Sequence, residues 1–99
     1  SCAGWWFRMV HAAQGWYITS TYYVTLTWRP SRSTDTARYE IWAAPRKGGP
    51  YFMTDIIDDR LAHQHTLANM PAGVYYFVMT SVDKSGNRSL QSNEVSVFV

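Results

Sequence analysis

The chain has 99 residues, with nine Lys and Arg against seven Asp and Glu and a single cysteine. This length allows one domain, which excludes an enzyme built around a cleft between two domains. The net charge of +2 comes from scattered cations, so nucleic acid is not an expected partner, and no apolar run approaches the roughly 20 residues that cross a bilayer.

Short runs of β-branched and aromatic residues, separated by turn-forming residues, predict an all-β chain of about seven strands. No segment shows the three-and-four apolar spacing of a helix. The clearest strand is expected at 23–28, where Val24, Leu26 and Trp28 share one face. Pro30 follows directly and ends it.

Three shorter patterns follow. Residues 37–44 alternate so that Tyr39 points inward and Trp42 points outward. Residues 51–57 predict a short edge strand that leads into an acidic loop, and residues 63–67 predict a second short strand.

The C-terminal part is predicted to form two strands joined by a tight turn. Residues 74–82 are apolar on both faces, which is typical of a central strand. The turn at 83–87 places Gly86 where a positive φ is easiest. The inner face of the last strand is formed by Val95, Val97 and Val99.

Several segments carry a joint pattern: 24–28 followed by Pro30, 39–41, 71–77, 82–87 and 92–97. Together they resemble a fibronectin type III domain of the bacterial sort over about residues 23–99. The resemblance implies a seven-stranded Greek-key β-sandwich of the immunoglobulin-like kind. It also implies that Trp28 is the core tryptophan and that Tyr75 is the corner tyrosine, whose hydroxyl bonds the backbone of the preceding loop.

The N-terminal region departs from this family pattern, which usually begins with a short proline-led strand. Here the first 22 residues hold three tryptophans. If 16–21 is the first strand, then residues 4–14 form a surplus apolar arm. The expected organisation is therefore an N-terminal aromatic arm at 1–15 and a sandwich at 16–99.

No catalytic motif is recognisable, which argues against an enzyme, and no cofactor or metal is expected. Asp55, Asp58 and Asp59 offer carboxylates for paired acid–base chemistry or for calcium, but they lack calcium-loop spacing and favour a solvated loop beside an edge strand. His63 and His65 would project from one side of a strand; a metal-free surface pair is favoured over a metal site.

Three other positions leave alternatives open. Cys2 is a lipid anchor, an intermolecular disulfide partner or, as favoured, a passive free thiol. Asn87-Arg88-Ser89 is an N-glycosylation sequon that occurs by chance at least as readily. Trp42 either marks a contact with sugar or protein, or lies under a neighbouring loop.

Two functions are expected. Domains of this family are usually non-catalytic modules of extracellular or cell-surface proteins, which is an inference from the resemblance. The first hypothesis is a structural or adhesive module that self-associates, up to a filament, or binds another surface protein through residues 4–14. Its anchor residues would be Trp5, Trp6, Phe7, Met9 and Val10.

The alternative hypothesis is a carbohydrate-binding or spacer module of a secreted multidomain enzyme. An exposed aromatic ring on a sheet provides a flat apolar surface with a polar edge, which suits the face of a sugar. The candidate stacking surfaces for a glycan are Trp42 and Tyr76.

Overall fold

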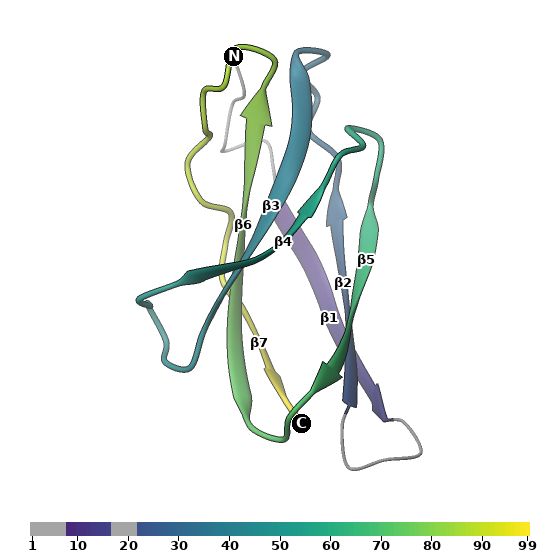
Figure 1. Ribbon diagram of the computed structural model, residues 1–99, viewed down its shortest axis with the longest axis vertical. Helices are drawn as coiled ribbons and strands as arrows, with labels where there is room; N and C mark the ends of the chain where they lie inside the picture. The colour runs from purple at the N-terminus through teal and green to yellow at the C-terminus, as the bar shows by residue number, and fades with distance from the viewer. Residues whose placement is uncertain (1–7, 17–21) are drawn as a thin grey trace.

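The computed structural model describes residues 8–16 and 22–99, which form two antiparallel sheets with no helix among them (Figure 1). This confirms the predicted all-β class. The strands are β1 (Arg8–Trp16), β2 (Tyr22–Arg29), β3 (Thr36–Ala44), β4 (Phe52–Ile57), β5 (Gln64–Met70), β6 (Val74–Asp83) and β7 (Val95–Phe98). One sheet has the order β1-β2-β5 and the other β4-β3-β6-β7. The Greek-key connection stays a prediction.

The first strand lies earlier than the sequence predicts. β1 spans Arg8–Trp16 instead of 16–21, and it pairs with β2 from Arg8 opposite Arg29 to Trp16 opposite Tyr22. The prediction of a first strand at 16–21 was wrong. Residues 8–16 include small residues, which weaken the alternation of apolar and polar side chains that marks a strand. Pairing with β2 along its whole length nevertheless makes them a strand. The part of the expected arm from residue 8 onward therefore belongs to the sheet.

The other strands agree closely with their predicted ranges. The strand expected at 51–57 is β4, and it does stand at the edge of its sheet. The strand expected at 63–67 begins one residue later and continues to Met70. β3 is central, because it pairs with β4 on one side and β6 on the other.

The hydrophobic core lies between the two sheets. Trp28 from β2 is 3% exposed, and its ring meets that of Tyr39 from β3 edge to face, with centroids 5.7 Å apart. Such aromatic pairs add about 0.5–1.5 kcal/mol to the gain from burial. The buried cluster comprises Val24, Leu26, Trp28, Tyr39, Ile41, Leu67, Phe77, Met79 and Val97.

Two tyrosine hydroxyls join loops to the sandwich. The Tyr39 hydroxyl accepts the Ser31 N–H at 2.8 Å and donates to the Arg60 carbonyl at 2.7 Å. The Tyr75 hydroxyl donates to the Pro71 carbonyl at 2.6 Å, the contact expected of a corner tyrosine. Trp28 lies in the core as expected, and its Nε1 finds no acceptor among the described residues.

Candidate functional site

A hollow of about 390 Å³ opens on the outer face of the four-stranded sheet. Trp42 comes from β3 and Thr80 from its neighbour β6, while Tyr51 immediately precedes β4. The other side is formed by the segment that joins β6 to β7. The lining residues are Trp42, Tyr51, Thr80, Arg88, Ser89, Leu90 and Gln91.

Trp42 is held in place by a chain of hydrogen bonds. Its Nε1 donates to the Thr80 hydroxyl at 2.9 Å, and that hydroxyl donates to Glu40 Oε1 at 2.8 Å. Arg88 donates two hydrogen bonds to the same carboxylate, from Nε to Oε1 at 2.7 Å and from Nη2 to Oε2 at 3.1 Å. The Arg88 guanidinium also lies 5.2 Å from the Trp42 ring centroid, within cation–π range.

The network fixes the charge state of Glu40. Burial of this side chain, which is 2% exposed, opposes ionisation. The hydrogen bonds from Arg88 and Thr80, with the charges of Arg88 and Arg38, outweigh that effect and hold the pKa of Glu40 below its usual value. Glu40 is therefore an anion at neutral pH, and it neutralises the Arg88 cation beside the hollow.

Tyr51 is anchored on the opposite side of the hollow. Its hydroxyl donates to Glu94 Oε2, which also accepts the Gly48 N–H at 2.9 Å. Burial, together with the neighbouring Glu94 carboxylate, raises the pKa of Tyr51 to about 12. The ring therefore remains a neutral, oriented phenol at any physiological pH.

The two predicted stacking residues share one face of the sheet but occupy different places. Trp42 is half-buried, lines the hollow and lies beneath Arg88. Tyr76 is paired with Ala44 and Ser96, so it lies further along the same face and does not line the hollow. Sequence reasoning missed Glu40, Tyr51 and Arg88.

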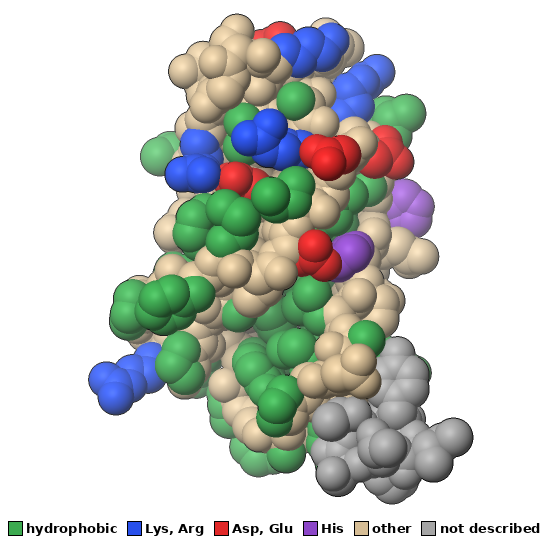
Figure 2. Space-filling view, in the orientation of Figure 1, with side chains coloured by type: hydrophobic (Ala, Val, Ile, Leu, Met, Phe, Trp, Pro, Cys, Tyr) green, Lys and Arg blue, Asp and Glu red, His purple; other side chains and the backbone are tan. Residues whose placement is uncertain are grey.

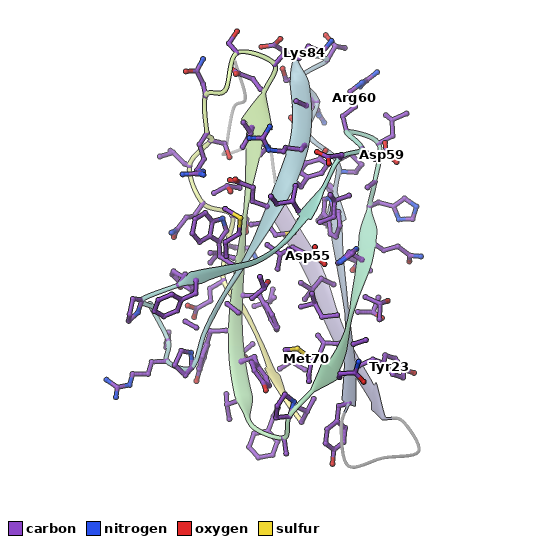
Figure 3. The ribbon with its side chains drawn as sticks, in the orientation of Figure 1. Tyr23, Asp55, Asp59, Arg60, Met70 and Lys84 are labelled. Atoms are coloured by element: carbon purple, nitrogen blue, oxygen red, sulfur yellow. The ribbon has the colours of Figure 1, made fainter. Side chains whose placement is uncertain are left out.

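The two histidines that the sequence pairs have different surroundings. His65 Nε2 lies 2.5 Å from Asp55 Oδ2, and the contact joins β5 of one sheet to β4 of the other. In Figure 3, Asp55 lies between these two strands. His63 precedes β5, is exposed, and its carbonyl accepts the Trp28 N–H at 3.0 Å.

The other acidic candidates form no metal site. Asp58 and Asp59 are exposed, and Asp59 Oδ1 accepts the Leu61 N–H at 2.9 Å, as in a solvated turn. In residues 8–16 and 22–99, no group of three or more His, Cys, Asp or Glu side chains could hold a metal ion. The same part of the chain has no helix long and apolar enough to cross a membrane.

The N-terminal candidates divide between β1 and the undescribed residues. Met9 and Val10 belong to β1. The remaining self-association candidates and the single cysteine lie outside the described residues; they are Cys2, Trp5, Trp6 and Phe7.

The glycosylation sequon sits in a closed turn. Asn87 Nδ2 donates to Asp83 Oδ2 at 3.1 Å, and the Asn87 N–H donates to Asp83 Oδ1 at 2.8 Å. The Ser89 hydroxyl accepts the Ser81 N–H and donates to the Leu90 carbonyl. In this turn the acceptor amide is engaged within the fold.

Comparison with protein-family models finds no match, and no curated protein matches the sequence. Solved structures do match. An Fn3-like protein from Clostridium thermocellum superposes with a TM-score of 0.69 at 19% identity, covering 95% of this chain and 92% of that one. The fold is that of a fibronectin type III domain.

The same fold occurs within larger enzymes. A β-1,2-glucanase from Parabacteroides distasonis matches all of this chain over 13% of its own length, with a TM-score of 0.75 and 18% identity. The pectate lyase PelI from Erwinia chrysanthemi, solved with tetragalacturonic acid, matches 89% of this chain over 28% of its own, with a TM-score of 0.63 and 16% identity. At these identities the likeness shows the fold alone.

Proposed function

We propose that this fibronectin type III module is a non-catalytic, extracellular or cell-surface domain that binds carbohydrate in the hollow beside Trp42. The proposal rests on one observation, namely that the Trp42 side chain is held in a fixed orientation. Trp42 is fixed by the hydrogen bond from Nε1 at the edge of its ring to Thr80 and by the Arg88 guanidinium over the ring, next to polar side chains. Binding a sugar then requires little ordering of the site, which favours affinity.

The charge balance favours an uncharged sugar. Glu40 takes two of the five guanidinium N–H groups of Arg88 and cancels its charge. The other Arg88 donors, with the Gln91 amide that lines the same hollow, suit the hydroxyl groups of a neutral glycan. Trp42 and Tyr51 supply the apolar surface that sugar rings prefer.

The structural neighbours support an accessory role. Both the glucanase and the pectate lyase contain this fold as a minor part of a longer chain. Both of these whole proteins are named for glycan chemistry, and we extend that context to this module only as part of the proposal. The module would hold a larger protein at a polysaccharide surface.

The test is a pull-down against a panel of insoluble neutral polysaccharides, followed by calorimetry with soluble oligosaccharides. Trp42→Ala is expected to weaken binding about tenfold or more, because it removes the oriented ring. Tyr76→Ala is the matched control on the same face outside the hollow, and its binding should match wild type. The proposal is wrong if the wild type binds nothing on the panel, or if both variants bind as it does.

Self-association through the N-terminal residues, the first function suggested by the sequence, now concerns a smaller segment. β1 already uses residues from Arg8 onward to pair with β2 of the same chain. What stays as a proposal is a contact made by residues 1–7 together with Met9 and Val10 of β1. We favour the carbohydrate-binding function because Trp42 is held in one orientation beside a hollow with polar lining.

A further inference from the structure

The edge strand β4 exposes an unusual amount of apolar surface. β4 ends its sheet and pairs only with β3 in the described part of the chain. Phe52 is 66% exposed, Ile56 45% and Met53 41%. An exposed apolar edge strand is a template for a strand of another chain.

The order of residues in β4 suits a second copy of itself. We propose that two copies of this protein pair antiparallel through β4, about a two-fold axis between Thr54 and Asp55. Met53 then lies opposite Ile56 of the second copy, and Phe52 opposite Ile57. The register with β3 sets Met53 opposite Trp42 and Ile56 opposite Glu40, so both side chains lie on the outer face. Each of these apolar residues therefore lies opposite an apolar residue of the second copy, and the two side chains of a pair lie on the same face of the joined sheet.

The one charged residue of β4 does not oppose itself in this arrangement. Asp55 faces Thr54 of the second copy, which avoids a like-charge pair. Its carboxylate is also satisfied within its own chain, because Oδ1 accepts the Ile56 N–H at 2.9 Å and Oδ2 contacts His65. Dimerisation would carry no unpaired charge into the interface.

The charges flanking β4 select the antiparallel direction. The exposed cations Arg46 and Lys47 lie in the β3–β4 turn, which carries the blue side chains at the lower left of Figure 2. The exposed Asp58 and Asp59 follow the other end of β4. Antiparallel pairing sets each basic end beside the acidic end of the second copy, whereas parallel pairing would set like charges together.

The test is a charge exchange followed by sedimentation analysis. The variants R46E/K47E and D58K/D59K should each be monomeric where the wild type dimerises, with a dissociation constant raised roughly tenfold or more. An equimolar mixture of the two should recover the dimer, because opposite charges meet again at both ends of the mixed pair. A monomeric wild type at millimolar concentration, or a mixture that stays monomeric, overturns the proposal.

A second pair of variants tests the strand itself. Ile56→Lys places an unpaired cation in the apolar row and should abolish the dimer. Phe98→Lys alters an even more exposed apolar residue, 74% against 45%, but on β7, and it should leave the dimer intact. If Phe98→Lys abolishes the dimer and Ile56→Lys does not, the interface lies at the β7 edge of the sheet and the proposal is wrong. Neither residue belongs to the buried core, so both variants should keep the circular dichroism and the thermal unfolding transition of the wild type, which checks folding independently of any ligand.

Discussion

Glu40 shows how one buried carboxylate can organise a surface. It faces the outer side of the sheet, yet only 2% of the side chain is exposed because Arg88 and Thr80 cover it. An isolated carboxylate would be costly there, but its two oxygens receive three hydrogen bonds in all. The same contacts that satisfy Glu40 fix Arg88 over Trp42.

The stabilising contribution of Glu40 should depend on pH. Its folded pKa is lowered relative to its ordinary value of 4.5. The stabilisation is therefore present above pH 4.5 and is lost as pH falls through the folded pKa. Glu40→Gln should cost about 1–3 kcal/mol in the free energy of unfolding at pH 7 and less at pH 3, measured by urea denaturation.

Asp83 and Glu94 provide the reference for that measurement. Their pKa values are also lowered, the first mainly by the Asn87 backbone N–H and the second mainly by the Tyr51 hydroxyl. Both carboxylates remain in Glu40→Gln, so the variant should keep a weaker pH dependence. If the free energy of unfolding falls by the same amount in the wild type and in Glu40→Gln between pH 5 and 3, the role assigned to Glu40 is wrong.

At the scale of elements, β1 decides whether the N-terminal region is core or appendage. An independent arm could be removed without loss of folding. Because β1 pairs with β2 along its length, deletion of residues 1–14 should instead lower the free energy of unfolding by about 3 kcal/mol or more. Deletion of residues 1–7 alone is the comparison, because it leaves β1 and its pairing with β2 in place, and the loss should be larger for the 1–14 deletion by thermal and urea denaturation. If the chain that lacks residues 1–14 is as stable as the wild type, the N-terminal region is an independent arm after all.

Most elements were predictable because local pattern and local structure coincide. In β2 the alternation of Val24, Leu26 and Trp28 matches their burial, and Pro30 follows the strand. The position of β1 was predicted wrongly because its alternation is weak and its place is set by pairing with β2, from Trp16 opposite Tyr22 to Arg8 opposite Arg29. Tertiary pairing overrides local pattern there.

The candidate site was predictable only in part. Trp42 could be placed on the outer face from alternation alone. Glu40 and Arg88 are 48 residues apart in the chain, and Tyr51 reaches Glu94 across 43 residues. No local pattern reports such contacts, so the network around Trp42 appears only in the folded sandwich.

For the whole molecule, the contact between Asp55 and His65 fastens the two sheets at one side. The two side chains are 42% and 29% exposed, so solvent screens the interaction. A double-mutant cycle with D55A, H65A and the double variant should give a coupling of about 0.5–1 kcal/mol. The cycle also removes the separate effect of losing the Asp55 contact to Ile56. A coupling indistinguishable from zero would show that the sheets are held by the core alone.

The first and last strands belong to different sheets, and both run downward in Figure 1. A pull between Arg8 and Val99 would therefore act along β1 and β7, dragging each lengthwise past its neighbour. Lengthwise sliding loads the hydrogen bonds of a ladder together, whereas peeling breaks them one after another. We therefore expect the module to resist a pull along its long axis, which measures 41 Å, more strongly than a pull that peels one strand from its sheet.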